Sequence, residues 1–165
     1  MYSIPNYYLT ALLIGIGATI VMDAWLLLLK KRGIPTLNFA FIGRWVGHLL
    51  RGKVFHRPIA SSEPIRNERA LGWIMHYATG VAFAALLLGI NGVPWVQQPT
   101  LLPALAVGLM TAAIPLFVIQ PAMGAGIASM KTASPVRNCL KSLANHAVFG
   151  LGLYLAATLI TAFVR

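Results

Sequence analysis

Acidic residues and cysteine are scarce in this chain. Only three of its 165 residues are Asp or Glu, one is Cys, and charged residues make up 10% of the total, whereas a soluble globular domain carries about 25%. The lone Cys139 excludes a disulfide framework, a Cys-x-x-Cys redox pair and a thiolate metal site within the chain. With 58% hydrophobic residues, a chain of this length has no interior large enough to hide its apolar surface, which excludes a soluble domain.

Long apolar runs show where this surface belongs. A helix needs about 20 residues to cross a bilayer, and four runs reach that length: residues 9–29, 70–90, 101–129 and 142–164. We therefore predict an all-α membrane protein, a four-helix bundle that forms a single integral membrane domain over residues 1–165. In the third run, Pro115 and Pro121 each remove a backbone hydrogen bond and predict a kink.

The basic residues indicate orientation. The net charge is +10, and twelve of the thirteen Lys and Arg residues fall between the first and second runs or between the third and fourth. Because loops rich in Lys and Arg stay in the cytoplasm, we predict that both termini lie outside, and we expect no nucleic acid partner. No Lys or Arg precedes the first run, so we interpret this run as a retained helix and not as a signal peptide.

The segment between the first two runs contains a shorter helical pattern. Over residues 38–51, large apolar side chains such as Trp45 fall on one face, and Arg44, His48 and Arg51 fall on the other. Such a basic amphipathic helix is typical of segments that lie on a membrane surface. We predict an interfacial helix on the inner leaflet, where Arg44, His48 and Arg51 contact anionic lipid headgroups.

Three ionisable residues lie inside the predicted spans. Asp23, His76 and His146 each lie five to seven residues from the nearest basic residue of the cytoplasmic segments, which places them about 10 Å inside the boundary at the rise of a helix. An ionisable group in a span is costly and usually has a partner. We predict that the three side chains converge in a buried polar cluster in the cytoplasmic leaflet, together with Asn145 and Gln120.

Small residues support this arrangement. In each of the three helices, Gly or Thr recurs four residues from the ionisable group, and small residues mark surfaces where membrane helices approach closely. Two interpretations remain open: a hydrogen-bonded clasp that fixes the packing, or a working site. His76 and His146 are both followed by Gly four residues later, a weak sign that the second helical pair repeats the first.

Several stretches together resemble a family of small bacterial membrane proteins, catalogued as domain of unknown function 2938. They are "GIGATIVMDAW", "GRWVGHLLRGK", "ERALGWIMHYATG", "PTLLPALAVGLMT", "QPAMGAGIAS" and "HAVFGLGLY". The resemblance extends from about Gly15 to Tyr154 and implies about four spans in the inner (cytoplasmic) membrane of a bacterium. It implies no activity, substrate or catalytic residue.

These features favour a non-enzymatic carrier or an accessory subunit, with membrane lipids as partners. A carrier of this size is expected to be a homodimer, because four helices enclose little space. One alternative is a haem or divalent metal site formed by His76 and His146, with Asp23 as a further metal ligand. Another is a lipid-directed enzyme in which Arg44, His48 and Arg51 hold a phosphate; however, no HExxH, GxSxG or other established catalytic motif is present.

Overall fold

The structure is a computed structural model that describes residues 6–164, and it is helical throughout that range, without a β-strand. Four helical segments are long and apolar enough to cross a membrane: Tyr7–Lys31, Glu68–Asn91, Leu101–Ala122 and Pro135–Phe163. Only 22–33% of each apolar stretch is buried within the protein, so most of its side chains are free to face lipid. The predicted all-α class and the four candidate spans are confirmed.

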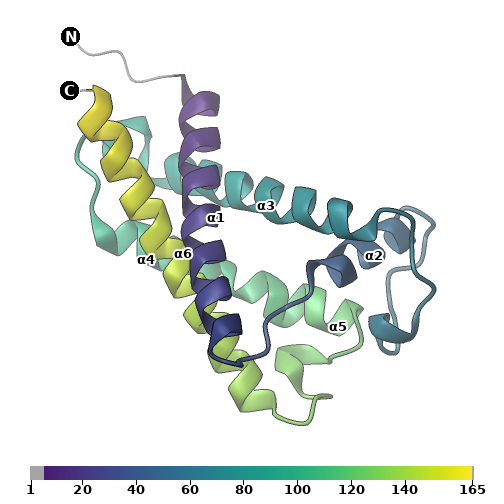
Figure 1. Cartoon of the computed structure of the whole chain (residues 1–165). Coiled ribbons are helices and arrows are strands. Elements are labelled where there is room, and N and C mark those ends of the chain that lie inside the picture. The colour runs from purple at the N-terminus through teal and green to yellow at the C-terminus, as the bar shows by residue number, and fades with distance from the viewer. Residues whose placement is uncertain (1–5, 165) are drawn as a thin grey trace. The chain divides into compact units, whose positions relative to one another are not determined.

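The elements follow one another along the chain as labelled in Figure 1. The α-helices are α1 (Tyr7–Lys31), α2 (Phe39–Leu49), α3 (Glu68–Asn91), α4 (Leu101–Thr111), α5 (Gln120–Ala122) and α6 (Pro135–Val164). Between them lie the 3₁₀ turns η1 (Ile59–Ser61), η2 (Val93–Gln97) and η4 (Ile127–Ser129) and the π-helical turn η3 (Pro115–Ile119).

Local chemistry explains several of these boundaries. The side chain of Asn6 accepts a hydrogen bond from the backbone N–H of Leu9 and caps α1, and Asn38 caps α2 in the same way through Ala40. Such caps satisfy N–H groups that a helix start leaves without a partner. Lys30 and Lys31 occupy the last turn of α1, where positive charge complements the helix dipole.

The third span differs from the prediction. It was expected to continue to residue 129, but its last α-helical element ends at Ala122. Gly124 and Gly126 have φ angles of 94° and 78°, a left-handed conformation that glycine adopts without strain and that stops a right-handed helix. Apolar residues continue past this point, which is why hydropathy alone extended the run too far.

The Cα packing divides the chain into two compact units. Within the described residues, the first unit comprises 6–35, 77–111 and 145–164, and the second comprises 36–76 and 112–144. The first therefore contains α1 and α4 with the later parts of α3 and α6. The second contains α2, the connection that follows it, and the irregular segment around η3, α5 and η4.

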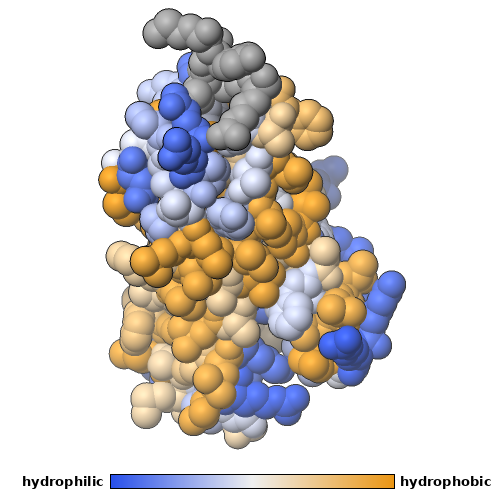
Figure 2. All heavy atoms as spheres, turned by 90° about the vertical axis from the view of Figure 1, so that its left-hand side faces the viewer, coloured by the Kyte–Doolittle hydropathy of each residue, from blue (hydrophilic) through white to orange (hydrophobic). Residues whose placement is uncertain are grey.

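Glycines bring the helices of the first unit into close contact. A Cβ on Gly15 of α1 would lie 2.5 Å from Cα of Val81 in α3, and a Cβ on Gly152 of α6 would lie 2.9 Å from Cα of Ala18 in α1. The core around these contacts is aliphatic and aromatic, with Ile14, Leu87 and Leu153 fully buried. Figure 2 shows that apolar side chains also cover much of the surface that it presents, as expected for helices in lipid.

In the second unit, α2 packs against the start of α3. A Cβ on Gly43 would overlap the carbonyl oxygen of Glu68, and one on Gly72 would overlap that of Phe39, so both helices need glycine at their crossing. Farther on, the backbone N–H of His56 donates to the carbonyl of Ala122 at 2.9 Å. The predicted helix over 38–51 is thus present as Phe39–Leu49, and its position at a membrane surface stays a prediction.

Candidate functional site

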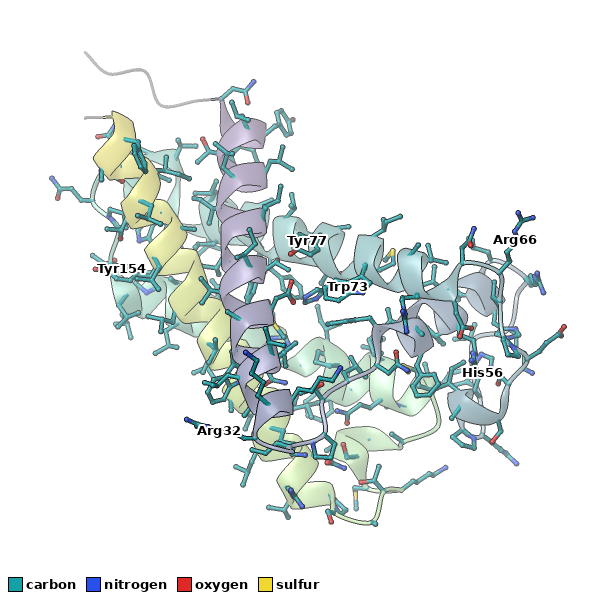
Figure 3. All side chains as sticks on the ribbon, viewed as in Figure 1. Arg32, His56, Arg66, Trp73, Tyr77 and Tyr154 are labelled. Carbon is teal, nitrogen blue, oxygen red and sulfur yellow. The ribbon has the colours of Figure 1, made fainter. Side chains whose placement is uncertain are left out.

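Asp23 has a phenolic partner within the first unit. The hydroxyl of Tyr77 in α3 donates a hydrogen bond to Oδ2 of Asp23 in α1, with an oxygen–oxygen distance of 2.8 Å (Figure 3). The two residues lie 54 positions apart in the sequence, so only the packing of α1 on α3 brings them together. That packing depends on Thr19 and Gly15, one and two turns before Asp23, where Gly80 of α3 approaches.

His146 is held by a threonine. Nδ1 of His146 lies 3.0 Å from the hydroxyl oxygen of Thr111, and this hydroxyl also lies 2.7 Å from the carbonyl oxygen of Gly108. Because the carbonyl can only accept, the hydroxyl proton points to Gly108, and Nδ1 of His146 donates to the hydroxyl oxygen. In the neutral ring, Nε2 then carries the lone pair and is the nitrogen that can gain a proton.

A second polar contact joins α6 to α1. The indole N–H of Trp25 donates to Oδ1 of Asn145 at 3.0 Å. Asn145 precedes His146, and Trp25 follows Asp23 by two residues, so the polar groups of the first unit occupy one stretch of each of these helices. Tyr77, Trp25 and Thr111 were absent from the predicted set, although Tyr77 lies beside His76 in the sequence and its depth was therefore visible.

The remaining two members of the predicted cluster belong to the second unit. The ring of His76 stacks on Phe39 with centroids 4.2 Å apart, and Trp73 meets it edge-on at 5.7 Å. Gln120 accepts a hydrogen bond from the hydroxyl of Ser129 at 2.7 Å. Asp23, Asn145 and His146 are in one unit and His76 and Gln120 in the other, so the convergence of all five stays a prediction.

Residues 6–164 contain no group of three His, Cys, Asp or Glu side chains placed to hold a metal ion. The candidate metal ligands His76, His146 and Asp23 therefore do not appear as a three-ligand site. The polar contacts that the structure shows for Asp23 and His146 involve the hydroxyl groups of Tyr77 and Thr111.

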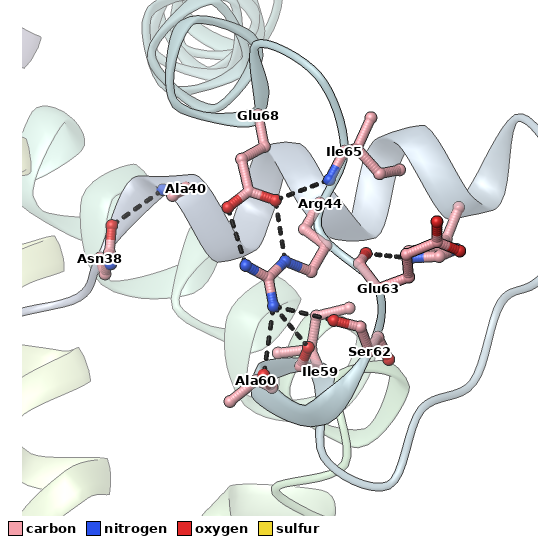
Figure 4. A network of polar contacts seen from close by, with 10 residues as sticks. Asn38, Ala40, Arg44, Ile59, Ala60, Ser62, Glu63, Ile65 and Glu68 are labelled. Carbon is pink, nitrogen blue, oxygen red and sulfur yellow. Dashed lines mark hydrogen bonds and ion pairs between the residues drawn. The ribbon is translucent and has the colours of Figure 1, made fainter.

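Arg44 is the centre of the polar network of the second unit (Figure 4). Its guanidinium forms a two-pronged ion pair with Glu68, with both N–O distances 2.8 Å, and it donates to the carbonyl oxygens of Ala60 and Ser62 at 3.1 and 3.0 Å. Arg44 is 8% exposed. The hydrogen bonds and charge of Glu68 raise the pKa of Arg44 above its usual value, so the pair is ionised and fastens α2, α3 and the connection to one another.

Two histidines extend this network. Nε2 of His48 lies 2.9 Å from the carbonyl of Glu63, Nδ1 of His56 lies 2.8 Å from the hydroxyl of Ser62, and the two ring centroids are 5.0 Å apart. Within the described part of the chain, Nε2 of His56 is buried without a hydrogen-bond partner. Burial lowers the pKa of His56, because an imidazolium there would lose its hydration.

The three residues predicted to contact headgroups are placed differently. Arg44 and His48 are buried, with 8% and 7% exposure, and both bind protein groups. Arg51 is exposed at the turn that follows α2. Contact with headgroups stays a prediction, and among the three Arg51 has the exposed side chain that such contact requires.

Comparison with known proteins gives a family and no activity. The family model described as "Protein of unknown function (DUF2938)" matches residues 12–160, in agreement with the resemblance noted in the sequence. No curated protein and no solved structure matches the chain.

Proposed function

Because the chain belongs to the DUF2938 family, whose description gives no activity, we propose a function from the geometry: a non-enzymatic membrane carrier that couples transport to the protonation of Asp23. The observation that carries this proposal is the hydrogen bond between Asp23 and the hydroxyl of Tyr77, formed between two candidate spans.

This pair suits a group that gains and loses a proton. An ionised Asp in the middle of a span costs about 2.5–3.5 kcal/mol on insertion scales, and a phenolic donor offsets part of that cost without adding a charge. The neutral acid keeps a partner as well, because its oxygens still accept a hydrogen bond from Tyr77. Both protonation states of Asp23 are therefore satisfied in the same geometry.

Features around the pair support movement of the helices. Membrane carriers work by shifting helices against one another around a fixed site, and α1 meets α3 and α6 through glycine and alanine and not through interlocked large side chains. His146, whose Nε2 is the proton-accepting nitrogen, provides a second titratable group on α6 in the same unit.

The proposed location is a bacterial cytoplasmic membrane, with both termini outside. Its support is the division of the basic residues, twelve of which fall in the two segments assigned to the cytoplasm. Reporter fusions after Arg165 and within the 32–67 connection test the orientation. We expect activity of a periplasmic reporter from the first fusion and of a cytoplasmic reporter from the second; the reverse pattern contradicts the orientation.

The proton-coupled role is tested by charge movement. Purified protein in liposomes, adsorbed to a solid-supported membrane, is exposed to a sudden drop in pH, with protons as the probe. We expect a transient current from the native protein and none from Asp23→Asn, whose amide keeps the hydrogen bond but does not titrate in this range. Glu63→Gln, which removes an exposed carboxylate outside the spans, is the matched control and keeps the current.

Two outcomes contradict the proposal. A current that persists in Asp23→Asn removes Asp23 from the mechanism. A native protein that is folded but gives no current is not a proton-coupled carrier on its own, which leaves the role of an accessory subunit. Circular dichroism and gel filtration of each variant show that a lost current does not come from misfolding.

A further inference from the structure

The turn after α2 presents apolar and basic side chains together. Leu50 is 82% exposed and Phe55 is 73% exposed, although both are large and apolar. Arg51, Lys53 and Arg57 alternate with them along the chain and are exposed as well. We call these five residues the basic tip.

The basic tip is held in one shape by the protein. Two backbone N–H groups, those of Arg51 and Lys53, donate to the carbonyl of His48 at 3.0 Å, and Gly52 between them has a φ of 79°, a conformation that favours glycine. The indole N–H of Trp45 donates to the carbonyl of Val54 at 2.9 Å. The exposed apolar side chains therefore stand on an ordered turn.

The same segment is tied to the ends of candidate spans. His56 and Ile59 donate backbone hydrogen bonds to the carbonyls of Ala122 and Met123, where the helical part of the third span ends, at 2.9 Å each. Arg44, one helix before the tip, is paired with Glu68 at the first residue of α3. Since a span ends at the membrane–water boundary, these bonds hold the tip near the lipid headgroups.

We propose that the basic tip binds the anionic lipid surface of the bilayer that the spans cross. Leu50 and Phe55 enter the headgroup region, and Arg51, Lys53 and Arg57 contact lipid phosphates. Charge complementarity selects this partner, because basic clusters beside a span are attracted to anionic lipids, while the apolar residues between them match the acyl boundary. The inference does not depend on the proton-coupled role of Asp23.

Spin labelling measures whether the tip enters the lipid. A label is attached at Phe55→Cys in a Cys139→Ser background, and the protein is reconstituted in vesicles of phosphatidylcholine alone or with phosphatidylglycerol. In the mixed vesicles we expect the label to be accessible to oxygen and shielded from a water-soluble nickel relaxant. The same label at Glu63→Cys, an exposed site outside the tip, is the control and should remain accessible to nickel.

A thermal-shift measurement tests the choice of lipid. In mild detergent, phosphatidylglycerol should raise the melting temperature of the native protein more than phosphatidylcholine does. The variant Arg51→Gln/Lys53→Gln/Arg57→Gln should lose most of this difference, whereas Arg66→Gln/Lys131→Gln/Arg137→Gln, with the same loss of charge at other exposed positions of the second unit, should keep it. Dissolved glycerol phosphate should not reproduce the shift, because it lacks acyl chains.

Three results overturn the inference: a label at position 55 that stays accessible to nickel in both vesicles, an equal loss in the two charge variants, or a full shift from glycerol phosphate. The first would indicate that the tip faces water and is available to an acidic protein partner. The third would indicate a site for free phosphate.

Discussion

The two compact units are stabilised by different chemistry. In the first, helices meet through glycine, with Gly108 of α4 and Gly150 of α6 so close that a Cβ on Gly108 would lie 2.6 Å from Cα of Gly150. In the second, an arginine holds the backbone: Arg44 binds one carboxylate and the carbonyl oxygens of the connection. One unit uses close backbone approach, and the other uses charge.

The difference follows from what each backbone needs. In the first unit most residues are helical and satisfy their backbone groups internally, so shape and dispersion decide how the helices associate, as they do in lipid. The second unit contains irregular backbone around residues 50–67 and 123–134, whose carbonyls need partners from elsewhere. Arg44 supplies several donors at one point, which explains why a costly charge is buried there.

Breaking the ion pair should have the largest effect. Glu68→Ala leaves the guanidinium of Arg44 buried without its carboxylate, and we expect a loss of about 2–4 kcal/mol in the stability of the second unit, since removing one partner of a buried pair is strongly destabilising. Unfolding in detergent, followed by proteolysis of the 32–67 connection, measures it. Replacing both residues by Met should recover most of the loss, and Glu63→Ala should have little effect.

Adding one methyl group tests the glycine contacts of the first unit. The Cβ of Gly150→Ala would lie 2.9 Å from backbone atoms of Ala104 and Leu105, so the helices must separate; we expect a loss of about 1–3 kcal/mol. The control is Gly89→Ala, where the nearest atom is the Tyr7 hydroxyl at 3.7 Å. Equal melting temperatures for the two variants would contradict a role for close backbone approach.

Tyr77→Phe should have a smaller effect, because it removes one hydrogen bond. Hydrogen bonds between membrane helices average about 0.6 kcal/mol and reach about 1.7, and we expect a destabilisation within that range, together with a weaker pH-jump current. Tyr8→Phe, at a position that is 80% exposed, provides the matched control. A Tyr77→Phe protein with native stability and native current would show that this hydroxyl does not serve Asp23.

The smallest effect concerns pH and His56. Burial holds the pKa of His56 below its usual value in the folded protein, whereas the unfolded chain takes up a proton near pH 6.5. Stability is therefore complete above about pH 6.5 and falls as the pH drops below that value. Measured between pH 8 and 5, proteolysis of the connection should accelerate in the native protein and change less in His56→Gln; identical profiles would rule out His56 as the cause.

The fold was largely predictable because apolar length and basic flanks are strong signals. The four candidate spans and the helix after Asn38 appear where hydropathy and periodicity placed them. The end of the third span was wrong because "GAGIAS" remains apolar while its glycines take left-handed conformations. The two glycines just after Pro121 were the available signal, and the hydropathy of Ile127 concealed it.

The site was less predictable, because neighbouring residues on a helix point in different directions. Matching depth identified the correct turn of α3, yet the hydrogen bond to Asp23 that the structure shows comes from Tyr77 and not from His76. Helical periodicity correctly grouped Arg44 with His48, but it does not show whether a polar face meets lipid or protein. The ion pair with Glu68 depends on the crossing of α2 and α3 at Gly43 and Gly72, which is tertiary information.

The π-helical turn Pro115–Ile119 affects how the third span can vary. The backbone N–H of Gln120 donates to the carbonyl of Pro115, five residues earlier, so this turn holds one residue more than an α-helical turn. Deleting a single residue here would restore an ordinary turn and rotate everything after it by about 100°, the angle between successive residues of an α-helix. Gln120 and Ala122 would then face new neighbours, so the length of this segment is as constrained as its sequence.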